Sequence, residues 1–72
     1  MNKPQNTTDD PNYHVKNVRN MMQDLVKHVE HDQQILEEPR VLALFETTRE
    51  VLQGLITAFN HYEEKSEKSW RD

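Results

Sequence analysis

The sequence predicts an all-α protein, an antiparallel hairpin of two long helices that dimerises into a four-helix bundle. Large apolar residues recur at alternating steps of three and four on both sides of Pro39, which is the spacing of a helix face. The frame of that spacing changes at the proline, so we expect a turn there. The chain has 72 residues and no cysteine, so a single copy is expected to need a partner to complete its core.

The first helix is expected over residues 11–37. Asp10 followed by Pro11 favours a helix start, because the carboxylate accepts from unpaired N–H groups and proline at the first helical position loses no hydrogen bond. Residues 1–10 are polar and are predicted to be a disordered tail. Asp32 occupies a core position of this helix, and we expect it to reach solvent near the end of the bundle. The apolar stripe consists of Val15, Val18, Met22, Leu25, Val29 and Leu36.

The second helix is expected over residues 39–66, followed by a C-terminal tail over residues 67–72. Trp70 in that tail is expected to fold back on the end of the bundle, or else to anchor a partner. Gly54 lies in mid-helix and is either a point of close approach for another chain or an exposed residue. The stripe is uninterrupted and consists of Val41, Phe45, Thr48, Leu52, Leu55, Phe59 and Tyr62, flanked by Leu42, Leu44, Val51, Ile56 and Ala58.

A change in the heptad frame of the apolar residues at Pro39 distinguishes a hairpin from one continuous helix. Continuing the first stripe beyond Leu36 would place Pro39, Ala43 and Glu46 in the core, whereas the apolar residues restart at Val41. Proline also disfavours helical dihedrals at the residue before it, so a short turn over residues 36–38 follows. No glycine ends the first helix, which leaves a long kinked helix, or a first helix split near Asp32, as alternatives.

Two equal helices can pair along their length, with Leu25 opposite Leu52 and Val15 opposite Tyr62. One helix packed on one other hides only a narrow strip, so a homodimer is predicted to cover the remaining apolar surface. This build resembles that of Rop, a small RNA-binding regulator of plasmid copy number, in architecture alone. The residues expected in the core and dimer interface are Val15, Val18, Met22, Leu25, Val29, Leu36, Val41, Leu44, Phe45, Thr48, Val51, Leu52, Leu55, Ile56, Phe59 and Tyr62.

Charge and composition argue against several classes of function. Nine Lys and Arg stand against thirteen Asp and Glu, giving a formal net charge of −4 that on average repels nucleic acid and anionic membranes. No apolar run is long enough for a signal peptide or a membrane span, so we expect a cytoplasmic protein without a membrane partner. The serines, Ser66 and Ser69, lie in the tail without a base, and one glycine cannot form a phosphate loop. We therefore predict no enzyme and no cofactor.

The four histidines raise a metal-binding hypothesis, which ranks third. His28, His31 and Asp32 have spacings that place side chains on one helical face, but the second helix offers only Thr48 and Arg49 opposite them. Solvated surface histidines are the preferred interpretation, and no metal ligands are assigned. His14 and His61 are expected to lie near each other at the end of the hairpin remote from the turn.

A polar stripe on the first helix supports the leading alternative function. Its cationic and amide side chains share one outward sector and could follow a phosphate backbone, although an ordinary solvated face has the same pattern. The preferred hypothesis is a small non-catalytic interaction or regulatory module that binds itself and an unknown protein partner; the alternative is an RNA- or DNA-binding regulator. The stripe consists of Lys16, Arg19, Asn20, Gln23 and Lys27.

Overall fold

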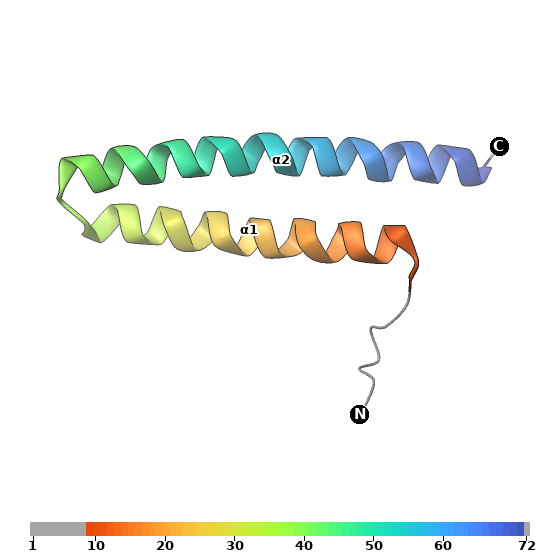
Figure 1. The fold of residues 1–72 in the computed structure, drawn as a ribbon, viewed down its shortest axis with the longest axis horizontal. Coiled ribbons are helices and arrows are strands. Elements are labelled where there is room, and N and C mark those ends of the chain that lie inside the picture. Colours follow the sequence, from red (N-terminus) through yellow and green to blue (C-terminus); the bar gives the residue numbers. More distant parts are fainter. Residues whose placement is uncertain (1–8, 72) are drawn as a thin grey trace, which may run out of the picture.

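The chain folds as two antiparallel α-helices in a computed structural model, which describes residues 9–71 and the side chains as far as residue 65. Helix α1 spans Pro11–Ile35 and helix α2 spans Pro39–Arg71. The two helices lie side by side along their length, joined by one short turn (Figure 1). The predicted all-α hairpin is confirmed. The two alternatives, one long kinked helix and a first helix split near Asp32, are excluded. Residues 1–8 of the tail predicted over residues 1–10, and the side chain of Trp70, lie outside the described part.

Local hydrogen bonds define both ends of α1. Asp10 caps the first turn, and its Oδ1 accepts from the backbone N–H of Asn12 at 3.1 Å. At the other end Leu36 adopts an extended conformation, φ −86° and ψ 148°, while its N–H still donates to the carbonyl oxygen of Asp32 at 3.0 Å. No described residue has a positive φ, so the helix ends by extension and needs no glycine. It ends earlier than the predicted residue 37.

Glu38 starts α2. Its Oε1 accepts from the N–H of Val41 at 2.8 Å, and its carbonyl accepts from the N–H of Leu42 at 3.0 Å. A carboxylate at this position also interacts favourably with the positive end of the helix dipole. Pro39 follows as the first helical residue, where its missing N–H loses no bond. The helix continues to Arg71, past the predicted end at residue 66.

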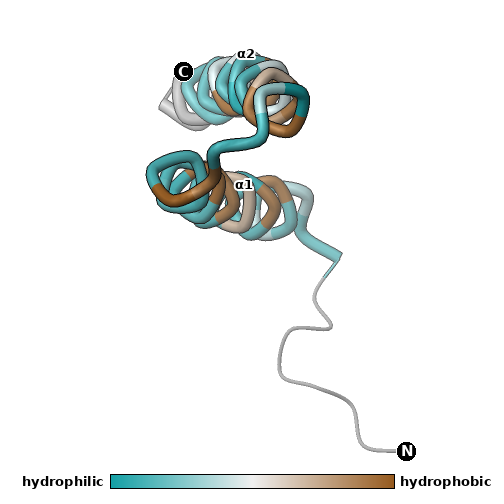
Figure 2. Tube along the Cα trace, turned by 90° about the vertical axis from the view of Figure 1, so that its left-hand side faces the viewer, coloured by the Kyte–Doolittle hydropathy of each residue, from teal (hydrophilic) through white to brown (hydrophobic). Residues whose placement is uncertain are grey.

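The core of one copy is small and lies midway along the hairpin. Val26, Val29, Leu52 and Ile56 are the buried residues among those described, with Met22 packed against the cluster. Around each helix apolar and polar residues alternate in the manner of an amphipathic helix (Figure 2). Val26 packs with Leu52 and Ile56, so the pairing is offset from the predicted contact between Leu25 and Leu52.

Candidate protein interface

The seam between the two helices follows a heptad frame that differs from the predicted one at every second position. Residues of this frame are buried or half-buried along the whole described hairpin. The predicted stripes share the positions of Val29 and Leu52 with it but not those of Leu25 and Leu55, which are exposed. The seam consists of Val15, Arg19, Met22, Val26, Val29, Gln33 and Leu36 from α1, and Leu42, Phe45, Arg49, Leu52, Ile56, Phe59 and Glu63 from α2.

An ion pair spans the seam near the end of the hairpin remote from the turn, which we call the open end. Arg19 on α1 donates from Nη1 to Oε1 of Glu63 on α2 and, at 3.2 Å, to Oδ1 of Asn60. The side chains of Arg19 and Glu63 are only 21% and 17% exposed. This partly buried pair lies at a position where the apolar pattern alone would not place a core residue.

A second polar cluster lies nearer the turn, with the charges exchanged between the helices. Arg49 on α2 donates from Nη2 to both carboxylate oxygens of Glu46, at 2.9 and 3.0 Å. Its Nη1 lies 3.9 Å from Oε2 of Glu30 on α1, and Gln33 Nε2 donates to Glu46 at 3.3 Å. The hydrogen bond from Arg49 is the largest cause holding the pKa of Glu46 below its ordinary value, followed by that from Gln33.

Large apolar side chains remain outside this seam and define what we call the apolar face. Met21 is 63% exposed, Leu44 is 61% exposed and Val51 is 56% exposed. On α2 the members recur at steps of three and four, one residue before each seam position. The apolar face consists of Val18, Met21, Leu25 and Ile35 on α1, and Val41, Leu44, Thr48, Val51, Leu55, Ala58 and Tyr62 on α2.

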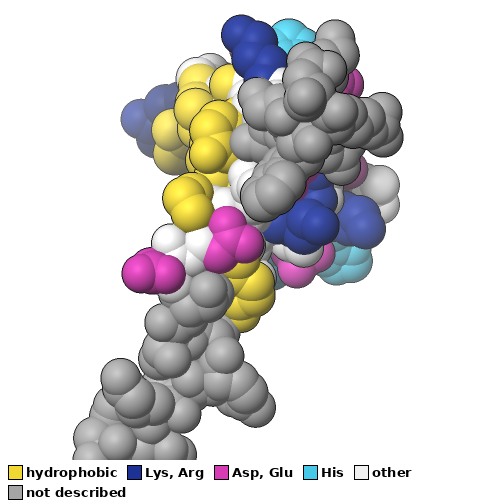
Figure 3. Space-filling view, turned by 90° about the vertical axis from the view of Figure 1, so that its right-hand side faces the viewer, with side chains coloured by type: hydrophobic (Ala, Val, Ile, Leu, Met, Phe, Trp, Pro, Cys, Tyr) yellow, Lys and Arg dark blue, Asp and Glu magenta, His cyan; other side chains and the backbone are white. Residues whose placement is uncertain are grey.

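Helix geometry places the two halves of the apolar face on the same side of the hairpin. A step back of one residue rotates a side chain by about 100° around its helix. Viewed along the common axis, this rotation has opposite senses in two antiparallel helices, so both stripes turn toward the same side. In Figure 3, seen from the open end, hydrophobic side chains gather in a band on the left, mainly over α2. The result is a surface stripe two helices wide.

The apolar face is hollowed near the open end. Val15, Ala58, Phe59 and Tyr62 line a shallow depression of about 290 Å³. Ala58 is the smallest side chain of the α2 half, which accounts for the dip between its larger neighbours. Gly54 lies beside this stripe, and a Cβ added to it would meet no atom within 4 Å. The apolar face therefore has a shallow depression, and the backbone beside it is accessible at Gly54.

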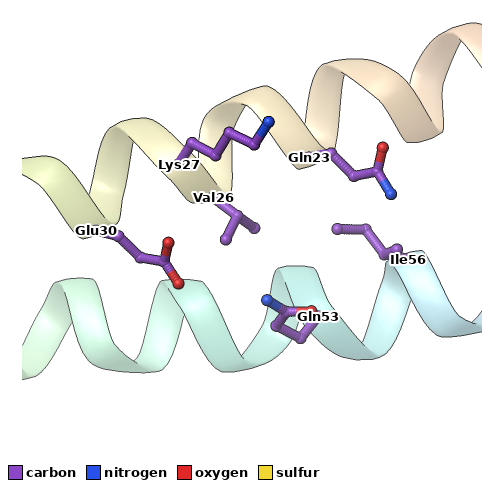
Figure 4. Close-up of a pocket in the computed structure, with 6 residues that line it drawn as sticks. All are labelled: Gln23, Val26, Lys27, Glu30, Gln53 and Ile56. Carbon is purple, nitrogen blue, oxygen red and sulfur yellow. The ribbon is translucent and has the colours of Figure 1, made fainter.

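The opposite side of the hairpin is polar. Gln23, Lys27 and Glu30 of α1 and Gln53 of α2 surround a second hollow, with the aliphatic seam residues at its floor (Figure 4). Here the structure places the candidate nucleic-acid stripe, whose members Lys16, Asn20, Gln23 and Lys27 are exposed.

One member of that stripe is placed differently from the rest. Arg19 lies in the seam and is bonded to Glu63, so its charge is already paired within the chain. Glu46 and Glu50 lie on the same side of α2 as Gln53, by their spacing of seven and three residues from it. Carboxylates thus accompany the cations on this side of the hairpin.

The histidine cluster forms one simple contact. His28 Nε2 lies 3.1 Å from Oδ2 of Asp32 one turn later, and the His28 side chain is 69% exposed. In the described part of the chain no group of three or more His, Asp or Glu side chains is placed to hold a metal ion. Nearer the open end, the His14 ring packs edge-on against Tyr13 at a centroid distance of 5.3 Å.

The fold and this surface define a class: a small amphipathic helical hairpin with an uncovered apolar face. Comparison of the chain with protein-family models, with curated proteins and with solved structures finds no match. Across the described residues, neither helix has a stretch apolar and long enough to cross a bilayer.

The predicted stripe on α1 leaves out the polar members of the seam, and Val26 is expected beside that stripe and not in it. The prediction followed apolar spacing, and the positions that distinguish the observed frame on α1 are Arg19, Val26 and Gln33, two of which are polar. A different signal was present in the sequence: Arg19 and Glu63, like Glu30 and Arg49, are opposite charges at positions that face each other once the helices pair. Charge pairing across the hairpin would have identified this frame.

Proposed function

We propose that the protein is a small non-catalytic interaction module that associates with a second copy of itself through the apolar face, forming a four-helix bundle. The observation that carries the proposal is the stripe of apolar or small residues on α2, in which Leu44, Val51 and Leu55 are each 45% exposed or more. Monomeric soluble proteins rarely expose contiguous apolar patches beyond a few hundred Å².

The dimensions of the apolar face suit a second hairpin. Helix α1 has 25 residues, or about 38 Å at a rise of 1.5 Å per residue, and two helices side by side are about 20 Å wide. The face therefore measures roughly 760 Å², close to the roughly 800 Å² that each partner contributes to a standard interface. A single helix would cover only part of this width, whereas an identical hairpin matches both dimensions.

The small core supports the same proposal. Val26, Val29, Leu52 and Ile56 are the only buried hydrophobic residues in the described part of one copy, and a chain of this size needs additional burial or cross-links to be stable. The chain has no cysteine that could supply a disulfide. A second copy would bury the apolar face and convert a two-helix layer into a bundle with a continuous core.

The dimer would leave the polar sides of both hairpins in contact with water. These surfaces, which contain Lys16, Lys27 and Glu50, are where a regulatory partner would bind without competing with self-association. The proposed module thus has one surface for assembly and another for recognition.

The experiment places the same new charge on either side of α2. We expect sedimentation equilibrium to show a dimer for the natural chain at micromolar concentrations. Leu55→Glu puts a carboxylate on the apolar face, and we expect dissociation to become at least about 100-fold easier, since desolvating an unpaired charge costs several kcal/mol. Gln53→Glu is the matched control on the polar side and should leave the dimer intact. A folded natural chain that sediments as a monomer at these concentrations would refute the proposal.

A further inference from the structure

We infer that self-association through the apolar face takes up protons, so that the dimer is tighter in mildly acidic than in mildly alkaline solution. The group that accepts the proton in each copy is His28, which is bonded to Asp32. This inference rests on the proposed self-association and adds its regulation. It requires only that the apolar face is covered, and it is independent of the direction in which the second hairpin lies.

His28 and Asp32 interrupt the α1 half of the apolar face. Each precedes a seam position by one residue, as do Leu25 before the pair and Ile35 after it. Leu25 is 45% exposed and Ile35 is 67% exposed. A partner that covers these two apolar side chains also covers the polar pair between them.

The polar pair is compact and is already partly covered in one copy. His28 Nε2 lies 3.1 Å from Oδ2 of Asp32, and the two side chains are 69% and 27% exposed. A second hairpin on the apolar face would remove the water that remains around them. A carboxylate that loses its hydration needs a compensating positive charge, and His28 is the bonded group that can gain one.

The α2 side chains next to the pair are uncharged. The ion pair between Glu30 and Arg49 places these two residues at about the same height along the hairpin. Counting from them along the antiparallel helices, Val51 lies level with His28, and Thr48 lies close to the level of its carboxylate partner. Neither side chain can compensate a charge.

The charged groups nearest to the pair do not supply the missing charge either. The α2 half of the apolar face contains no ionisable side chain over residues 41–58. Arg49 lies in the seam, where it is paired with carboxylates of both helices. On α1, Asp24 and His31 are exposed within one turn of His28, but their spacing places them opposite the seam, outside the apolar face.

A second copy brings the same side chains to the interface. Apart from its own polar pair, the ionisable groups at apolar-face positions are His14, Tyr62 and Lys65, and all three lie at the open end. Proton uptake by His28 is therefore the means of compensating Asp32 that is available at the pair itself.

The charge of the pair differs between the two conditions. In alkaline solution His28 is neutral, so each copy would place one uncompensated carboxylate in the interface. At about pH 6 the imidazole is largely protonated, the pair is neutral as a whole, and Nε2 still donates to Asp32. Covering the apolar face favours the protonated form, and by linkage protons favour the covered face.

The size of the effect follows from one proton taken up by each copy. The dissociation constant can then change by up to about 100-fold per unit of pH within the range where histidine titrates. We expect association to be at least about 10-fold tighter at about pH 6 than at about pH 8.

Sedimentation equilibrium at these two pH values and fixed salt concentration tests the inference. Lower pH also protonates the other histidines and reduces the net negative charge, which favours association of any kind. His28→Gln removes the proposed proton acceptor and should abolish most of the difference between the two conditions. His31→Gln is the matched control, because it removes an exposed histidine three residues away on the outer side of α1 and should keep the difference.

Asp32→Asn provides a second readout. It keeps the shape of the side chain and removes the carboxylate that the proton compensates. A protonated His28 would then be the uncompensated charge in the interface, so the preference for acidic solution should disappear or reverse. Full retention of that preference in Asp32→Asn would contradict the inference.

The outcomes separate this inference from the proposed function. Loss of the pH dependence in His28→Gln but not in His31→Gln supports the inference. A natural dimer that is equally tight in both conditions, or tighter in alkaline solution, overturns the inference and leaves self-association intact, as does an unchanged pH dependence in His28→Gln. A natural chain that stays monomeric in both conditions overturns the proposed function itself.

Discussion

Two valines of identical chemistry offer a direct measure of whether the apolar face is covered in solution. Val26 is 6% exposed and belongs to the core of one copy, whereas Val51 is 56% exposed and belongs to the apolar face. Replacing each by alanine removes the same two carbon atoms. The difference between the two variants therefore depends on burial alone.

The expected costs follow from those exposed fractions. At about 0.8 kcal/mol for each buried carbon, Val26→Ala should destabilise the hairpin by about 1.5 kcal/mol, because its side chain is 6% exposed. Val51→Ala should cost about 0.7 kcal/mol in a single hairpin, because more than half of its surface is already in water. If a second copy covers the apolar face, the cost of Val51→Ala should rise to that of Val26→Ala.

Urea unfolding at a series of protein concentrations distinguishes the two cases. The free energy of unfolding should depend on protein concentration, because association with a second copy stabilises the folded hairpin by mass action. The cost of Val51→Ala, about half that of Val26→Ala where the protein is dissociated, should approach it where the dimer is saturated. A cost for Val51→Ala that stays near 0.7 kcal/mol at every concentration would show that the apolar face is never buried, and the reasoning would fail.

Two further predictions concern the hairpin itself. Gly54→Ala should raise the free energy of unfolding by about 1 kcal/mol, since alanine is the better helix former and a Cβ there meets no atom within 4 Å; a loss in thermal unfolding would mean that another chain approaches this backbone. Glu46 has its pKa lowered in the fold by Arg49 and Gln33, so its stabilising effect should be present above its ordinary pKa of 4.5 and disappear as the pH falls below it. Glu46→Gln should weaken the dependence of the free energy of unfolding on pH in this range. The same loss of stability at acid pH in the variant would contradict the assignment.

The hairpin could be predicted from the sequence because it depends on local rules. Asp10 before Pro11 is a capping signal that acts within one turn, and it forms the expected hydrogen bond. Glu38 before Pro39 caps the start of α2 in a similar way. The change of frame at Pro39 likewise reflects a steric effect on its neighbour. The missing glycine was no obstacle, since Leu36 ends α1 in an extended conformation open to any residue.

The rotation of each helix about its axis could not be predicted from apolar spacing. Two adjacent heptad frames share Val15, Met22 and Val29, and apolar spacing predicts the more apolar of them as the seam between the helices. In the structure that seam follows the frame with Arg19 and Glu63, because these charges reach each other across the hairpin. Where a helix has two adjacent apolar faces, the number of apolar residues on each face does not determine which face packs against the neighbouring helix.

The exchange of charges between the two ends of the hairpin has a consequence for how the helices are aligned. At the open end the cation, Arg19, belongs to α1, and nearer the turn the cation, Arg49, belongs to α2. Sliding one helix past the other by seven residues would part Arg19 from Glu63 and would leave either Arg19 facing Ile56 or Glu63 facing Val26, a charge against an aliphatic side chain. The alignment of the two helices is thus fixed by charged residues within the helices. The connecting turn can vary in sequence without changing which residues meet.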